Sequence, residues 1–89
     1  MSLIENFEAA QERVKKLTKT PETSELLELY GLYKQSVAGD VTGSRPGMLD
    51  FKGRAKYDAW AARRGTSKEE SMQNYVNLVS ELEKKYGTR

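Results

Sequence analysis

The amino-acid sequence predicts an all-α domain built as a small four-helix bundle. Apolar side chains recur at three- and four-residue spacing in four stretches, which is the pattern of helices with one buried face. Capping residues, glycine and proline separate these stretches, and no segment shows the apolar–polar alternation of a convincing strand. A chain of 89 residues has the length of one domain, so we expect a single domain over residues 1–89.

The N-terminal half predicts two helices. Ser2 and Glu5 have the spacing of a capping box and open a helix over residues 3–16. The apolar residues that share its face are Phe7, Ala10, Val14 and Leu17. Thr20 followed by Pro21 is a helix start signal, because threonine caps well and proline in the first turn needs no N–H donor. We therefore expect a second helix from that signal to about residue 38.

The C-terminal half predicts two more helices after a long loop. Residues 38–48, AGDVTGSRPGM, contain three glycines and a proline and therefore predict an irregular connection. Asp50 is placed to cap a third helix that extends to about residue 63. Thr66 and Glu69 have capping-box spacing and open a fourth helix that stops at Gly87. Because a connection of about 11 residues can cross the bundle, we expect the second and third helices to run in the same direction.

The composition limits the classes of function. Histidine and cysteine are both absent, which removes the usual metal ligand, thiolate chemistry and the best proton-transfer group at neutral pH. We therefore expect no cofactor and no metal site, and an enzyme is the least expected class. No run approaches the ~18 apolar residues that span a bilayer, and the segment MSLIENFEAAQERV lacks the apolar stretch of a signal peptide. These features favour a cytoplasmic protein without stable membrane insertion.

Positive charge is concentrated in one part of the chain. The formal net charge is +2, yet residues 45–64 carry six basic and two acidic side chains, whereas residues 1–44 carry five basic and seven acidic ones. Such a concentration indicates an anionic partner without identifying it.

The segment LYGLYKQ places two tyrosines and a lysine on the apolar face of the second helix. At ~100° per residue, Tyr33 falls about 60° from Tyr30 and Lys34 about 40° from it, so the lysine lies within the apolar arc. A lysine there can extend its ammonium group to solvent, or it can face a ligand. Gly31 costs ~1 kcal/mol relative to alanine inside a helix. Either close helix packing or a ligand that approaches the backbone would explain it.

Other helices place the same residue types at the border of their apolar faces. Lys52 and Lys56 are four residues apart on the third helix, a spacing that is mildly unfavourable unless an anion lies near both ammonium groups. Lys15 borders the face of the first helix, and Tyr75 lies within that of the fourth. Several such residues in a small bundle predict a cleft with an apolar floor and a cationic, aromatic rim. Its ligand would combine an apolar tail, a flat ring and phosphates.

Two long segments resemble the acyl-CoA-binding protein family, LYGLYKQSVAGDVTGSRPGMLDFKGRAKYDAW and GTSKEESMQNYVNLVSELEKKYG. With Phe7 and Pro21, the similarity covers nearly the whole chain. The resemblance implies a four-helix up-down-down-up bundle. It also implies a small cytoplasmic carrier, a monomer without catalytic activity, that binds and transports medium- and long-chain fatty acyl-CoA. The sequence departs from the family at Tyr57, where the family usually has tryptophan, and this leaves the preferred acyl length open.

The resemblance also implies the ligand contacts, position by position. They are Lys15 in the first helix, Tyr30, Gly31, Leu32, Tyr33 and Lys34 in the second, Lys52 and Lys56 in the third, and Tyr75 in the fourth. The adenine ring would stack on Tyr33, and Lys34 and Lys56 would hold the 3′-phosphate. The acyl groove would include Ala10, Leu26 and Leu27.

Two other classes remain open from the residues alone. A basic segment interleaved with aromatic residues is also used by nucleic-acid-binding modules, although the basic side chains here do not follow one helix face, and we expect no nucleic-acid partner. A helical scaffold that binds a protein or a membrane surface would use the tyrosines only as core residues.

Overall fold

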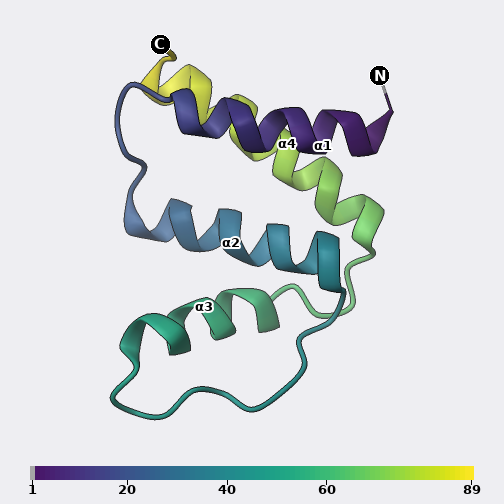
Figure 1. Cartoon of the computed structure of the whole chain (residues 1–89), viewed down its shortest axis with the longest axis vertical. Helices are drawn as coiled ribbons and strands as arrows, with labels where there is room; N and C mark the ends of the chain where they lie inside the picture. Colours follow the sequence, from purple (N-terminus) through teal and green to yellow (C-terminus); the bar gives the residue numbers. More distant parts are fainter. Residues whose placement is uncertain (1) are drawn as a thin grey trace.

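The computed structural model describes residues 2–89, which form four α-helices joined by irregular segments. The α-helices are α1 (Leu3–Arg13), α2 (Thr23–Ala38), α3 (Phe51–Ala61) and α4 (Lys68–Tyr86), and a 3₁₀ turn, η1 (Val14–Lys16), continues α1. Figure 1 shows α2 and α3 running in one direction and α1 and α4 in the other. The predicted all-α, up-down-down-up bundle is therefore confirmed. Within residues 2–89, no helix is long and apolar enough to cross a bilayer.

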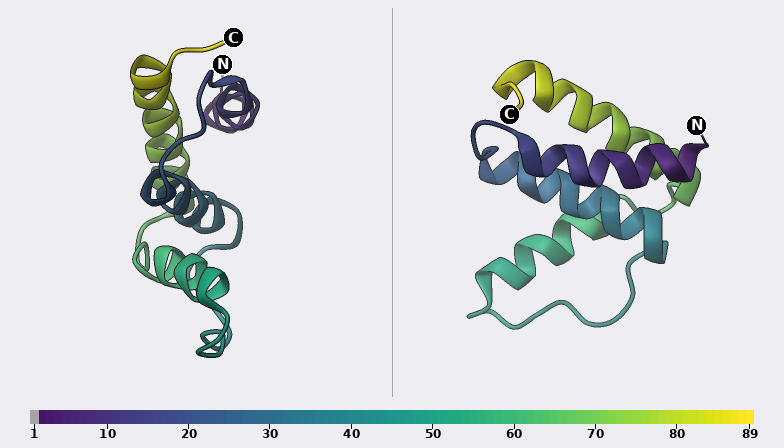
Figure 2. Two further views of the ribbon diagram at one scale, coloured as in Figure 1. Left: turned by 90° about the vertical axis from the view of Figure 1, so that its left-hand side faces the viewer. Right: turned by 45° about the horizontal axis from the view of Figure 1, so that its top comes forward.

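The helices are arranged as a flat slab rather than a symmetric bundle. Its dimensions are 38 × 28 × 15 Å. The backbone of α2 packs on α4 and on α3, whereas among the described helices α1 packs closely only on α4. The edge-on view in Figure 2 shows α3 and its loop at one end of the slab, opposite the two chain ends. α3 therefore has a single neighbour among the described helices, α2.

Several predicted helix ends are confirmed. The Ser2 hydroxyl accepts a hydrogen bond from the Glu5 N–H, and the Glu5 carboxylate accepts one from the Ser2 N–H, which completes the predicted capping box. The Asp50 carboxylate accepts from the Gly53 N–H and caps α3. α4 ends at Gly87, whose φ of 79° lies in the left-handed region that favours glycine.

Other predicted ends were wrong by one to three residues. α2 is capped at Glu22 rather than at Thr20, because the Glu25 carboxylate accepts from the Glu22 N–H at 2.9 Å. α4 is capped by Ser67 rather than Thr66, since the Ser67 hydroxyl accepts from the N–H three residues later. The α-helical part of the first helix ends at Arg13, and that of the third at Ala61. In each case a neighbouring residue with equivalent capping chemistry, or a tighter last turn, ends the helix.

The apolar core lies among α1, α2 and α4. Its buried members are Phe7, Ala10, Leu17, Leu29, Leu32, Tyr75, Val79 and Leu82. No residue of α3 is buried to this degree. α1 is further tied to α4 by the Arg13 guanidinium, which donates to the Glu83 carboxylate.

Polar contacts hold the long loop between α2 and α3. The Tyr57 hydroxyl donates to the Gly43 carbonyl oxygen at 3.0 Å, and the Trp60 indole N–H donates to the Gly39 carbonyl oxygen at 2.8 Å. Arg45 forms a two-pronged ion pair with Asp58, at 2.9 and 2.7 Å. The loop is therefore fixed along one side of α3.

Candidate ligand-binding site

The contact between α2 and α3 is closest at Gly31. A Cβ atom at this position would lie 2.4 Å from the carbonyl oxygen of Ala59, which is closer than real Cβ contacts occur. Gly31 is buried, and the missing side chain lets the two backbones approach. Of the two explanations left open by the sequence, close helix packing accounts for this glycine.

Two lysines and two aromatic rings face each other in reciprocal pairs across this contact. The Lys56 ammonium group of α3 lies 5.5 Å from the ring centre of Tyr30 on α2. One turn further along, the Lys34 ammonium group of α2 lies 4.8 Å from the ring of Trp60 on α3. A ring attracts an ammonium group without neutralising it, so the N–H donors remain available to an anion. In the described part of the chain, neither lysine has a carboxylate partner.

A pocket with a volume of about 250 Å³ opens at the first of these pairs, Lys56 and Tyr30. Its lining combines apolar side chains from α2 and α3 with two lysines: Thr23, Leu26, Leu27, Tyr30, Lys52, Ala55 and Lys56. α2 and α3 run in the same direction (Figure 1), and the residues that line the pocket come from the N-terminal halves of both helices. The pocket thus has an apolar floor and a cationic rim.

Sequence reasoning missed two of the lining residues, Thr23 and Ala55. Thr23 begins a set of positions spaced i, i+3, i+4 and i+7 that ends at Tyr30, and Ala55 lies between Lys52 and Lys56 on the same helix face. The periodicity would have identified both residues if the faces had been extended by one turn.

Three aromatic rings form a second part of the site. The Phe7 ring stacks on the Tyr33 ring with centres 6.2 Å apart, and it meets the Tyr75 ring edge-on at 5.2 Å. Tyr33 is 38% exposed, whereas Tyr75 is buried. Burial raises the pKa of the Tyr75 hydroxyl, and the nearby Tyr33 raises it further. Tyr33 therefore presents to solvent a ring that is backed by Phe7, and Tyr75 contacts Phe7 from the core.

The structure does not bring every predicted contact to the pocket. Ala10 is completely buried in the core, and Leu32 is buried beside it, so neither lines the open groove. The spacing of apolar residues on one helix identifies a buried face but does not distinguish a groove from a core.

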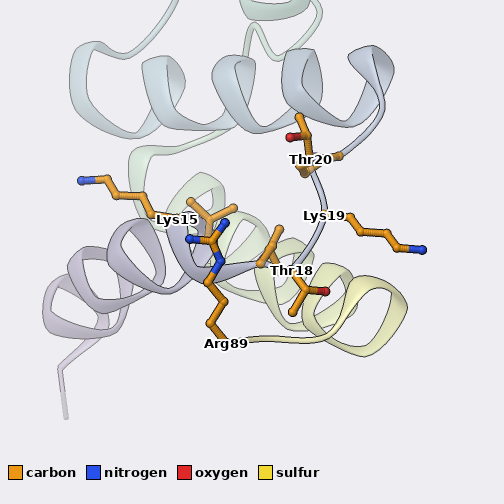
Figure 3. Close-up of a pocket in the computed structure, with 8 residues that line it drawn as sticks. Lys15, Thr18, Lys19, Thr20 and Arg89 are labelled. Carbon is orange, nitrogen blue, oxygen red and sulfur yellow. The ribbon is translucent and has the colours of Figure 1, made fainter.

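Lys15 also lies outside the α2–α3 pocket. Its ammonium group is 3.0 Å from the Glu12 carboxylate, and it borders a smaller pocket of about 180 Å³ near the end of the chain. Figure 3 shows Lys15 and Lys19 extending in opposite directions from this pocket, with Arg89 beside it. The residues near Lys15 therefore do not converge on one point in this structure.

The side chains of the site offer the chemistry of binding. The α2–α3 pocket supplies apolar contact and ammonium donors, and the exposed Tyr33 ring supplies a face for stacking. Within residues 2–89, no group of three histidine, cysteine, aspartate or glutamate side chains is placed to hold a metal ion.

Comparisons with known proteins agree with this arrangement. The family model described as acyl CoA binding protein matches residues 4–79. A putative acyl-CoA-binding protein from a Hypsibius species is 52% identical over 87 residues, which cover 98% of each chain. An acyl-CoA-binding protein from Brassica napus is 54% identical over 82 residues, covering 92% of this chain and 89% of that protein.

Solved structures give the same result. The crystal structure of Oryza sativa acyl-CoA-binding protein 2 superposes with a TM-score of 0.89 at 46% identity, covering 93% of this chain and 90% of that one. The corresponding protein from Moniliophthora perniciosa gives a TM-score of 0.88 at 44% identity, covering 100% and 87%. The chain therefore belongs to the acyl-CoA-binding protein family.

Proposed function

We propose that the protein binds medium- and long-chain fatty acyl-CoA thioesters and carries them without changing them. The observation that carries this proposal is the α2–α3 pocket, where an apolar floor adjoins Lys52 and Lys56, neither of which has a carboxylate partner among the described residues. An acyl-CoA has the matching combination of an apolar tail, a flat base and phosphates. Membership of the acyl-CoA-binding protein family supports the same ligand class.

The head group would be held by the rim. The adenine ring stacks on the exposed Tyr33 ring, because an aromatic face accepts any flat base. Lys34 and Lys56 donate to the 3′-phosphate, and each charge-assisted hydrogen bond contributes about 1.5–3 kcal/mol. Lys15 and Lys52 add further positive charge near the other phosphates. Lys15 would have to leave Glu12 to do so, at little cost because exposed ion pairs are weak.

The acyl chain would lie against Leu26, Leu27 and Ala55. Leu26 is 44% exposed in the free protein, so it offers apolar surface that a tail can cover. A pocket of about 250 Å³ is smaller than a typical ligand site of about 300–1,000 Å³, so it takes part of the tail. Each buried methylene contributes ~0.8 kcal/mol, so a dozen give about 10 kcal/mol before the cost of ordering. The tail therefore supplies most of the affinity, and the head group selects a CoA ester.

The proposed role is that of a cytoplasmic, monomeric carrier. The sequence has no histidine and no cysteine, so the site lacks the usual nucleophile and general base, which supports binding without catalysis. A chain without cysteine is also suited to a reducing compartment, where no disulfide is needed.

Calorimetry with palmitoyl-CoA, coenzyme A and palmitate tests the ligand class. We expect the intact thioester to bind far more tightly than either half, because only it satisfies both the apolar floor and the lysines. Equal affinity for palmitate and palmitoyl-CoA would contradict the proposed head-group site. Tight binding of a single-stranded oligonucleotide at physiological salt would favour the nucleic-acid alternative instead.

Single substitutions test the two lysines that we propose hold the 3′-phosphate. Lys34→Ala and Lys56→Ala should each weaken palmitoyl-CoA binding by roughly 10–100-fold, the equivalent of one charge-assisted hydrogen bond. Lys84→Ala, which removes an exposed lysine of α4, is the matched control and should bind as the wild type does. Unchanged affinity in both site variants would reject the proposed phosphate contacts while leaving the tail site intact.

A further inference from the structure

Three large apolar side chains remain exposed where the long loop meets α3. Met48, Leu49 and Phe51 are 78%, 92% and 75% exposed, respectively. They are the three most exposed of the large apolar side chains in the described part of the chain. We call Met48, Leu49 and Phe51 the α3 tip. Four residues contain three exposed apolar side chains, and a cluster of this kind marks an interaction site more often than scattered single residues do.

The α3 tip is held in its exposed position by the surrounding structure. The Asp50 carboxylate, between Leu49 and Phe51 in the sequence, accepts from the Gly53 N–H at 3.0 Å and so fixes the start of α3. The preceding loop is tied to α3 by the Arg45–Asp58 ion pair and by the Tyr57 hydroxyl. The apolar side chains are therefore presented by a fixed turn and do not belong to a loose segment.

Positive charge lies directly beside the α3 tip. Residues 45–58 carry four basic and two acidic side chains, of which Asp58 is paired with Arg45 and Asp50 caps α3. Lys52 and Lys56 are exposed and have no carboxylate partner within residues 2–89. Exposed apolar side chains next to lysines without carboxylate partners match the surface of an anionic bilayer, where lysines meet lipid phosphates and apolar groups enter the acyl boundary.

We propose that the α3 tip docks the protein on anionic lipid bilayers. Three side chains are too few for a stable protein interface, which buries about 800 Å² on each partner, but they suffice for reversible insertion supported by charge. Lys52 follows the tip directly and lines the α2–α3 pocket, so docking brings the mouth of that pocket to the lipid surface. The first and last described residues lie at the opposite end of the slab from α3 and its loop (Figure 2).

Docking of the α3 tip on a bilayer does not require bound acyl-CoA. The collection of acyl-CoA from a membrane by the docked protein, in contrast, rests on the proposed function. Long acyl chains partition into bilayers because each methylene favours an apolar environment. A carrier that docks with its pocket at the lipid surface shortens the path of the tail through water. Docking and acyl-CoA binding are therefore best measured separately.

Flotation with unilamellar vesicles tests docking. The wild type should bind vesicles of roughly 70% phosphatidylcholine and 30% phosphatidylserine. It should bind pure phosphatidylcholine vesicles at least roughly tenfold more weakly, a difference on the order expected for two or more lysines near an anionic surface. About 0.5 M NaCl should release it from the anionic vesicles, because salt screens this attraction. Leu49→Glu should reduce binding to the anionic vesicles about tenfold or more. Ile4→Glu, at a 58% exposed apolar position of α1, should leave it unchanged. Absence of wild-type binding, or equal binding by the two variants, overturns the proposal.

The absence of cysteine permits a second, direct measurement. An environment-sensitive dye on Leu49→Cys should shift to the blue on addition of anionic vesicles, whereas the same dye on Ile4→Cys should not. Equal shifts at both positions would mean that no particular face enters the bilayer, and would overturn the proposal.

Calorimetry without vesicles separates docking from ligand binding. Leu49→Glu should bind palmitoyl-CoA with the wild-type affinity, because Leu49 does not line the pocket. Loss of palmitoyl-CoA binding together with unchanged vesicle binding would assign the tip to the ligand and overturn docking. Failure of the wild type to bind palmitoyl-CoA, with vesicle binding intact, would reject the proposed function and leave docking supported.

Discussion

The two sides of α2 are packed in different ways. On the side that faces the core, Leu29 and Leu32 are buried together with residues of α4. On the other side, α3 contributes no residue that is buried to the same degree, and its contact centres on Gly31. α3 is held mainly by backbone approach, by cation–ring pairs and by the polar ties of its loop.

This difference indicates how stability and binding are divided in the molecule. Apolar burial dominates folding free energy, so the unit of α1, α2 and α4 should open last and α3 should open at lower free energy. A ligand whose tail fills the α2–α3 pocket adds apolar contact where the free protein has least. Binding should therefore protect the amides of α3 from hydrogen exchange more than those of α4.

The largest expected effect is on the core side, with Leu32→Ala. Removing a buried leucine side chain costs about 2–5 kcal/mol of unfolding free energy, because contacts are lost and a cavity remains. Chemical denaturation measures this loss. The affinity for palmitoyl-CoA, measured where the variant is folded, should stay close to that of the wild type. A large loss of affinity without loss of stability would show that Leu32 contacts the ligand.

Gly31, the residue next to Leu32, tests the side of α2 that faces α3. In Gly31→Ala, the new methyl group meets the backbone of Ala59, and overpacking of this kind costs about 1–3 kcal/mol, more than the ~1 kcal/mol that alanine gains in helix propensity. α3 should move away, so palmitoyl-CoA binding should weaken together with stability. Gly47→Ala is the control, because a Cβ there meets no atom within 4 Å. A Gly31→Ala variant with unchanged affinity would mean that the site does not depend on this contact.

A third substitution should stabilise the core. The Ser71 hydroxyl is buried in α4 and has no hydrogen-bond partner among the described residues, which costs about 1–3 kcal/mol relative to a satisfied group. Ser71→Ala should therefore raise the unfolding free energy by about 1 kcal/mol. Thermal melting measures the change. A lower melting temperature would mean that the hydroxyl is hydrogen-bonded after all.

A smaller effect is expected in the loop. Tyr57→Phe removes the hydrogen bond to the Gly43 carbonyl oxygen, which contributes about 0.5–1.5 kcal/mol. The loss should appear mainly as faster hydrogen exchange in α3 and the loop, with little change in α4. Equal acceleration in all helices would contradict the view that α3 opens separately.

The smallest change is confined to acid pH. Hydrogen bonds from Tyr86 and then Lys85 lower the pKa of Glu25 to about 2 from its ordinary value of 4.5. A lowered folded-state pKa contributes stability above pH 4.5 that is lost as pH falls toward 2. Melting temperatures measured between about pH 2 and pH 7 should therefore fall less steeply for Glu25→Gln than for the wild type. Glu8→Gln, an exposed control, should follow the wild type. Parallel curves for all three proteins would exclude this contribution.

Local signals in the sequence predicted much of the fold. Capping at Ser2 and Asp50 and termination at Gly87 depend on residues within one turn of each other, so they could be predicted without the tertiary structure. The starts of α2 and α4 were misplaced, because Glu22 and Ser67 offer capping spacing that competes with the predicted residues. The direction of α3 followed from the length of one loop.

The candidate site was predicted only in part. Periodicity placed Tyr30, Lys34 and Lys56 at the border of apolar faces, and the structure places all three at the α2–α3 contact. The pairing of Lys34 with Trp60 depends on how far α3 is displaced along α2, and the sequence pattern of one helix alone does not determine this displacement. The burial of Ala10 likewise depends on which helix α1 packs against.

The partner of α1 has a consequence for how the chain acquires its structure. Among the described helices, the backbone of α1 packs closely only on α4, the helix that lies furthest from it in the sequence. The Phe7 ring can already meet the Tyr33 ring of α2, but the backbone of α1 has its close neighbour only once residues 68–86 are present. Since contacts between distant parts of a chain form late and slowly, we expect the docking of α1 on α4 to be a late step of folding.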